Sequence, residues 1–146
     1  MNKSSVVLSV FLLLSANGVR AESAAEIVEV YKSPYCGCCT KWIAHLQQAG
    51  FTVRAHDVTD VAQERQKLGM PGRFAACHSA RVGNYAIEGH VPAADIRRLL
   101  QEQPQATGLA VPSMPPGSPG MEGAYAVPYE TLLVQGDGSY RIFARH

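Results

Sequence analysis

The sequence predicts an α/β protein, and three consecutive segments near its start predict it. Residues 27–31, IVEVY, are short and rich in β-branched side chains, as in a strand. From residue 39 to 49, apolar residues recur every three or four positions before Gly50, which is typical of an amphipathic helix that ends at a glycine. Residues 51–58 alternate as a second strand. A strand, a helix and a strand within about 30 residues predict a βαβ unit with parallel strands.

Residues 1–21 have the features of an export signal. Lys3 precedes the apolar residues 6–16, and Ala21 supplies the small residue at a cleavage site. We therefore expect a signal peptide at 1–21 and one mature domain at 22–146. No later stretch approaches the roughly 20 apolar residues of a membrane helix, so we expect an exported protein that is not membrane-embedded. The 13 basic and 12 acidic residues balance, which argues against nucleic acid as a partner.

The rest of the chain predicts further elements. Asp60 can cap a helix that stops at Gly69, residues 69–80 are expected to form a loop, and residues 85–88 a strand. Pro92 suits the start of a third helix. Prolines and glycines then punctuate about 25 residues, a length of loop that is more often functional than idle. TLLV and YRIFA, separated by a GDG turn, predict a closing β-hairpin.

This order of elements matches a thioredoxin-like fold, which is a statement about topology and not about function. In this interpretation residues 77–127 form an elaboration, including the long Pro/Gly/Met loop, inserted before the closing hairpin. We expect Pro128 to be a cis-proline opposite the thiols, with Pro112 as the competing candidate.

Three of the four cysteines lie within four positions, in SPYCGCC. Cys36, Cys38 and Cys39 fall where the first strand ends and the first helix begins, which is where open α/β sheets place their sites. The free N–H groups of a helix's first turn favour a thiolate there. Because thiolates both bind soft metals and attack disulfides, the spacing leaves both uses open.

The redox interpretation takes Cys36 and Cys39 as the C-x-x-C pair of a thiol–disulfide oxidoreductase. A third thiol at Cys38 would disturb a clean two-electron couple. A structural zinc domain is another alternative, but such sites usually draw on two C-x(2–4)-C pairs, and this chain has one cluster and one distant cysteine.

The metal interpretation uses Cys38 directly and adds Cys77 as a fourth sulfur. Thiolate, thioether and imidazole groups together suit Cu(I), and crowded thiols suit a polynuclear site in which sulfur bridges several ions. As alternatives, the methionines can anchor the loop on the sheet, and the histidines can cap turns. The further candidate ligands are His78, His90, Met114 and Met121.

Four segments resemble the CopG-type periplasmic copper-resistance proteins, a family first known as a domain of unknown function. They are VYKSPYCGCCTKW, HLQQAGF, CHSARVGNYAIEGHVPAADIRRLL, and GLAVPSMPPGSPGME followed by PYETLLV. The resemblance runs from about Val30 to Phe143. It implies a thioredoxin-like fold, copper bound by the four cysteines, and a role in copper tolerance that includes interconversion of Cu(I) and Cu(II). Other periplasmic copper-handling proteins would be its partners, and no catalytic residue is assigned.

Overall fold

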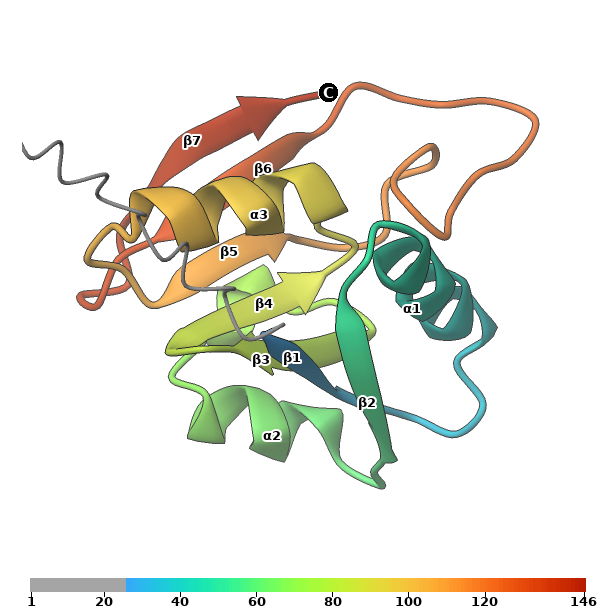
Figure 1. Ribbon diagram of the computed structural model, residues 1–146, viewed down its shortest axis with the longest axis horizontal. Helices are drawn as coiled ribbons and strands as arrows, with labels where there is room; N and C mark the ends of the chain where they lie inside the picture. The colour runs from blue at the N-terminus through green and yellow to red at the C-terminus, as the bar shows by residue number, and fades with distance from the viewer. Residues whose placement is uncertain (1–25) are drawn as a thin grey trace, which may run out of the picture.

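The computed structural model describes residues 26–146, so the expected signal peptide lies outside the described part. A single mixed sheet has the order β2-β1-β3-β4-β5-β6-β7, and three α-helices pack on it (Figure 1). The strands are β1 (Ile27–Lys32), β2 (Thr52–Asp57), β3 (His78–Val82), β4 (Tyr85–Gly89), β5 (Gly108–Val111), β6 (Glu130–Val134) and β7 (Tyr140–Arg145). The helices are α1 (Gly37–Gln48), α2 (Val61–Lys67), the short 3-10 helix η1 (Gly72–Phe74) and α3 (Ala93–Glu102). Within residues 26–146, no helix has the length and apolar character to cross a membrane.

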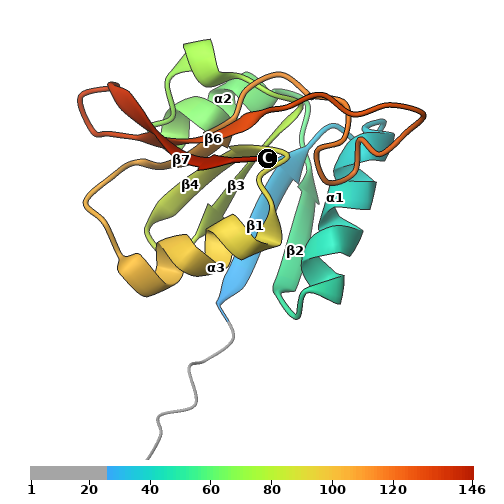
Figure 2. The ribbon, with the colours of Figure 1, turned by 90° about the horizontal axis from the view of Figure 1, so that it is seen from above.

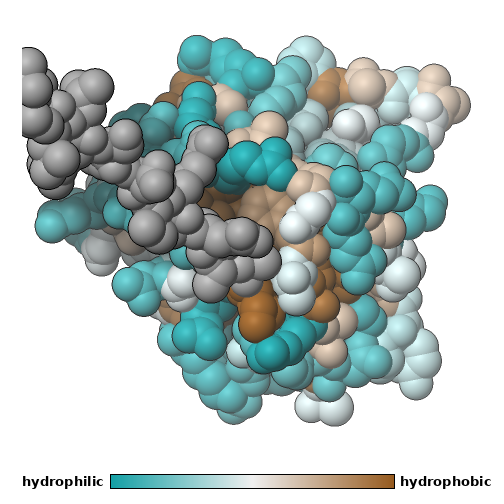
Figure 3. Space-filling model, in the orientation of Figure 1, coloured by the Kyte–Doolittle hydropathy of each residue, from teal (hydrophilic) through white to brown (hydrophobic). Residues whose placement is uncertain are grey.

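The helices form two layers, one on each face of the sheet. Helices α1 and α3 lie on one face and α2 on the other (Figure 2). Because successive strand residues point to opposite faces, each face has its own apolar core. In the view of Figure 3, hydrophilic side chains surround a central region where hydrophobic ones show. The α1 and α3 face includes Val28, Val30, Trp42, Leu46, Ile96 and Leu99, and the other face includes Met70, Phe74, Ala86, Ala110 and Val134.

The βαβ unit is confirmed. Strands β1 and β2 pair in parallel from Ile27↔Thr52 to Lys32↔Asp57, and α1 connects them. Helix α2 begins after Asp60, whose carboxylate accepts from Gln63 N–H at 3.0 Å, as its expected cap role requires. Helix α3, strand β4 and the β6-β7 hairpin also form where the sequence predicts them.

The expectation that residues 77–127 are an inserted elaboration is wrong. This segment supplies β3, β4, α3 and β5, and β3 and β4 lie in the middle of the sheet. Strand β3 pairs antiparallel with β1, which places residue 77 beside the turn that carries the other cysteines. Residues 78–80, expected to lie in a loop, form the start of β3. The polar residues His78, Ser79 and Arg81 hide the strand character of β3 in the sequence, although His78 and Ser79 are fully buried in the structure.

The closing hairpin, β6 and β7, lies at one end of the sheet, away from β1. Strand β6 pairs with β5 and β7, and residues 112–129 connect β5 to β6 without a helix or strand. This connection lies beside the first turn of α1 (Figure 2). No peptide bond among residues 26–146 is cis, so the expected cis form at Pro128 or Pro112 is wrong. The segment opposite the thiol turn is the one that precedes β3, because β3 and not the hairpin pairs with β1.

Candidate metal and thiol site

The turn between β1 and α1 carries three of the cysteines. Cys36 is the N-cap of α1, and its Sγ accepts from the N–H of Cys39 at 3.3 Å. Cys36 and Cys39 form a disulfide across the first turn of the helix. Cys38 has a free thiol whose Sγ lies 3.5 Å from that of Cys36. Lys32 secures the start of this turn, because its ammonium donates to Asp57 at 2.6 Å and to the carbonyl of Ser33 at 3.3 Å.

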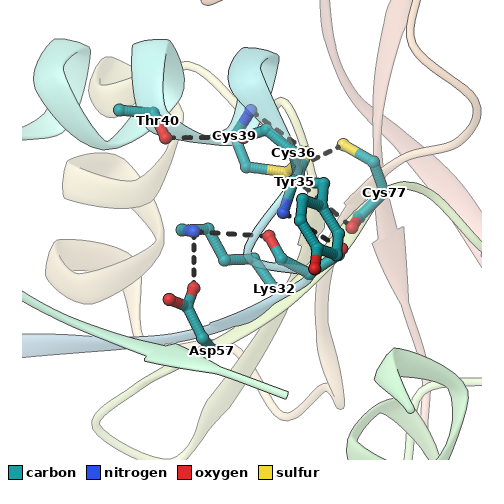
Figure 4. Close-up of polar contacts among 8 residues, drawn as sticks. Lys32, Tyr35, Cys36, Cys39, Thr40, Asp57 and Cys77 are labelled. Atoms are coloured by element: carbon teal, nitrogen blue, oxygen red, sulfur yellow. Dashed lines mark hydrogen bonds and ion pairs between the residues drawn. A yellow bond between two sulfur atoms is a disulfide. The ribbon is translucent and has the colours of Figure 1, made fainter. Parts of the chain in front are cut away.

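Cys77 joins this group from the segment directly before β3, the strand that pairs with β1. Its Sγ lies 3.5 Å from that of Cys39 and 3.9 Å from that of Cys38. Figure 4 shows Cys77 pointing toward the Cys36–Cys39 pair from a separate segment of chain. The Sγ atoms of all four cysteines lie within 4.8 Å of one another. A site with this donor set can hold a soft metal ion through sulfur once the disulfide is reduced.

Two buried histidines extend the site on the side of Cys77. The Nε2 of His90 lies 3.0 Å from Cys77 Sγ, while its Nδ1 donates to the carbonyl of Pro119 at 2.7 Å. The bond to Pro119 assigns the proton to Nδ1 and leaves the lone pair of Nε2 facing the sulfur. His78 Nδ1 lies 3.5 Å from the same sulfur, and its ring packs on Trp42 with centroids 4.3 Å apart. The ligand atoms of Cys77, His78 and His90 also lie within 4.8 Å of one another.

Burial sets the protonation of these groups. It raises the pKa of the Cys77 thiol to about 12, and the neighbouring Cys38 adds to this shift. It lowers the pKa of His78 to about 3, with a smaller contribution from the charge of His90, whose own pKa is lowered by burial. The imidazoles are therefore neutral at neutral pH, as a metal ligand must be, whereas Cys77 has to release a proton to bind a metal.

The loop between β5 and β6 covers part of the site. The Sδ of Met114 lies 4.0 Å from Cys38 Sγ, and the side chain is partly exposed. Gly120 packs against the first turn of α1: a Cβ there would lie 2.8 Å from the carbonyl oxygen of Cys38 and from the N of Trp42. Met121 follows in the same turn, but the contacts of the described residues include none between its sulfur and a cysteine. Of the two methionines, only Met114 thus lies against the cysteines.

One group of residues around the site was not predicted from the sequence. Arg65 of α2 and Glu88 of β4 are both buried and bond to the residue before Cys77. In the sequence they look like ordinary charged residues of a surface helix and a strand. The only available signal was the acidic residue inside the apolar strand YAIEG.

The protein is therefore a mixed α/β protein whose four cysteines form a candidate metal site at a strand-to-helix junction. Two solved structures, titled "Copper resistance protein copG- Form 2" and "Form 1", resemble the chain with TM-scores of 0.80 and 0.79. Each is 37% identical to it over 84% of this chain, and the match covers 99% and 98% of their own chains. A family model described as a protein of unknown function, DUF411, matches residues 74–121. No curated protein matches the chain.

The chain therefore belongs to the CopG family, and the resemblance noted in the sequence is confirmed.

Proposed function

We propose that the protein is a periplasmic copper-binding protein of copper resistance that holds Cu(I) through Cys36, Cys38, Cys39 and Cys77. The observation that carries the proposal is the meeting of four Sγ atoms, from two separate segments, within 4.8 Å of one another. Thiolates select soft cations, and Cu(I) is the softest of the common choices. The printed names of the two related structures, both copper resistance proteins, support copper as the metal.

The proposed ligand set also includes His78, His90, Met114 and Met121. His90 and Met114 have the stronger support, because Nε2 and Sδ lie 3.0 Å and 4.0 Å from cysteine sulfurs. A Cys77 sulfur that faces both thiols and imidazoles suits a bridging role, which supports a polynuclear site.

The Cys36–Cys39 disulfide supports a redox extension of this proposal. Opening it consumes two electrons and two protons and yields two thiols. In the reverse direction, the two thiols release those electrons and protons, which is the amount needed to reduce two Cu(II) ions to Cu(I). We therefore include the interconversion of Cu(I) and Cu(II) in the proposed function.

The fold and the location form part of the same proposal. We propose a thioredoxin-like fold extended by β5, β6 and β7. Its support is the order β2-β1-β3-β4, with α1 connecting the parallel pair. Residues 1–21 have the pattern of a signal peptide, which supports export to the periplasm, where other copper-handling proteins would be the partners.

The second candidate function is that of a thiol–disulfide oxidoreductase, and the disulfide itself favours it. Cys36 is partly exposed while Cys39 is fully buried. Because exchange requires access to the attacking sulfur, Cys36 would attack and Cys39 would resolve the mixed disulfide.

The two functions are separated by Cys38→Ser. Reduced protein would be titrated anaerobically with Cu(I) against a chromophoric Cu(I) chelator, and its copper–sulfur coordination measured by X-ray absorption. We expect Cys38→Ser to weaken Cu(I) binding by at least the roughly 100-fold that loss of an outer group can cause. The Cys38→Ser variant should still reduce a disulfide-containing model substrate only if Cys36 and Cys39 form a working redox couple.

Two results would count against copper. Wild-type protein that binds Cu(I) no more tightly than Cys38→Ser would overturn the proposal. Zinc retained in preference to copper, after purification from a copper-fed culture, would favour the structural zinc domain instead.

A further inference from the structure

A buried ion pair lies directly behind Cys77. Arg65 of α2 is 8% exposed and Glu88 of β4 is fully buried, and Arg65 Nε donates to Glu88 Oε1 at 2.8 Å. Taking two charges out of water costs more than their attraction returns unless the remaining polar atoms are also bonded. The partners of this pair therefore show what the fold gains from it.

The partners include both backbone polar groups of one residue. The N–H of Ala76 donates to Glu88 Oε1 at 2.7 Å, and its carbonyl accepts from Arg65 at 3.1 Å. The hydroxyl of Ser79 donates to the other Glu88 oxygen at 2.6 Å. Burial raises the pKa of Glu88, but Ser79, Ala76 and Arg65 all oppose that shift. Because every partner donates and none accepts, the ionised carboxylate is the form that fits this environment.

Ala76 is the residue immediately before Cys77. Residues 75–77 belong neither to η1, which ends at Phe74, nor to β3, which begins at His78. Regular backbone pairing therefore does not fix the peptide that carries the Cys77 side chain. The two charged side chains take over that role by holding Ala76 from its N–H and from its carbonyl.

We propose that Arg65 and Glu88 are positioning residues for Cys77, which hold the peptide before it so that its sulfur faces Cys39 and His90. The sulfur–sulfur distance of 3.5 Å to Cys39 and the 3.0 Å distance to His90 Nε2 are the geometry that this clamp maintains. The consequence for copper rests on the proposed function, whereas the consequence for the accessibility of Cys77 does not.

The test measures Cys77 directly in the copper-free, oxidised protein. With Cys36 and Cys39 bridged, Cys38 and Cys77 are the free thiols. Alkylation by iodoacetamide, followed by peptide mass spectrometry, gives the ratio of the Cys77 rate to the Cys38 rate, with Cys38 as an internal reference. The double variant Arg65→Met/Glu88→Met removes the clamp without leaving a buried charge unpaired. We expect the ratio to rise about tenfold and Cu(I) affinity to fall about tenfold, the lower end of the effect of groups that orient ligands.

A conservative variant separates positioning from general stability. Arg65→Met/Glu88→Gln keeps an acceptor for the N–H of Ala76, so its ratio should return to within about twofold of wild type. Arg65→Lys keeps the positive charge but cannot donate to Glu88 and to Ala76 with the fixed fork of a guanidinium, and its ratio should rise about threefold. This last variant provides the test even if the double methionine variant does not fold.

The matched control is Asp95→Asn. Asp95 of α3 is also a buried carboxylate, and it accepts from Thr131 at 2.6 Å and from His146 at 2.9 Å without contacting a cysteine. In Asp95→Asn, the ratio of the Cys77 to the Cys38 alkylation rate should stay at the wild-type value. Equal ratios in the Met/Met and Met/Gln variants, or an unchanged ratio in Arg65→Lys, would overturn the inference. Failure of wild-type protein to bind Cu(I) would overturn the proposed function and leave the alkylation result to stand by itself.

Discussion

The two segments that bring the cysteines together are held in place by different forces. The α1 segment, with Cys36, Cys38 and Cys39, is fixed by local geometry and by the apolar core, through an N-cap and the buried face of Trp42 and Leu46. The segment before β3, with Cys77, is fixed by polar contacts to distant residues of α2 and β4.

The two segments should therefore respond differently to mutation. Apolar packing is distributed over many contacts, so the α1 segment should respond to mutation mainly through global stability. Polar positioning is concentrated in a few bonds, so the Cys77 segment should respond mainly through the geometry of one sulfur.

Trp42→Ala should have the largest effect on stability. The side chain is fully buried, and its indole N–H donates to the carbonyl of Val91 at 2.8 Å. Its removal should lower the free energy of unfolding by about 4 kcal/mol, as for other large-to-small core substitutions. Urea unfolding followed by circular dichroism would measure it, with Tyr35→Ala as the control. Tyr35 is 94% exposed, so its substitution should change stability by no more than about 0.5 kcal/mol.

A loss below about 1 kcal/mol for Trp42→Ala would contradict the view that the core holds the α1 segment.

Gly120→Ala should have the next largest effect. Gly120 has a φ of +87°, and its added Cβ would meet the backbone of Cys38 and Trp42 at 2.8 Å. The left-handed conformation and the overlap together should cost about 3 kcal/mol and push the loop away from the thiols. Unfolding by urea and the Cu(I) titration would report the two consequences.

Gly123→Ala is the matched control in the same loop, because no atom lies within 4 Å of its added Cβ. Equal losses in the two variants would mean that close packing on α1 is not the cause.

Acid should destabilise the copper-free protein through His78. Its pKa is about 3 in the folded state and 6.5 without the fold, so the unfolded chain binds more protons between these values. This loss of stability is absent above pH 6.5. Below that pH the free energy of unfolding falls by about 1.4 kcal/mol per pH unit, a loss of about 2 kcal/mol at pH 5. His78→Phe should remove this part of the pH dependence. Urea unfolding at pH 5 and pH 7 would measure the difference, and parallel profiles for the two proteins would exclude His78 as its source.

His45→Leu should have the smallest effect. Nε2 of His45 accepts from the N–H of Ala93 at 3.1 Å and so caps α3, whose own N-cap Pro92 offers no side-chain bond. Loss of such a cap costs about 1 kcal/mol. His45→Gln keeps an acceptor and should recover part of the loss in thermal unfolding. No difference between Leu and Gln would show that the capping bond contributes nothing.

The sequence predicted the local elements well and the arrangement of the sheet poorly. The βαβ unit, the cap at Asp60, the start of α3 next to Pro92 and the final hairpin follow from patterns within about 30 residues, and all are present. Strand β5, GLAV, was missed inside a region dominated by prolines and glycines. The central place of β3 was missed because pairing with β1 joins residues about 50 positions apart, which no local periodicity records.

The candidate site divides in the same way. The cluster at residues 36–39 was visible because its cysteines are close together in the chain, and Cys77 was expected to join it as the one remaining sulfur donor for a soft metal. The sequence left two uses of these thiols open, metal binding and a redox disulfide, so it did not fix the Cys36–Cys39 bridge that the structure contains. Arg65 and Glu88 were missed, because two charged residues 23 positions apart show no joint sign of burial, and the acidic residue within YAIEG alone does not identify its partner.

Near neighbours in the sequence are enough to specify the first strand, the thiol turn and the amphipathic helix α1, since each follows from local contacts. The pairing of β3 with β1, which brings the Sγ of Cys77 to 3.5 Å from that of Cys39, depends on the assembled fold. The burial of Arg65 and Glu88 behind Cys77 depends on the assembled fold in the same way. Strand pairing and burial form between distant segments, so their free energy is a property of the assembled sheet and not of either segment alone.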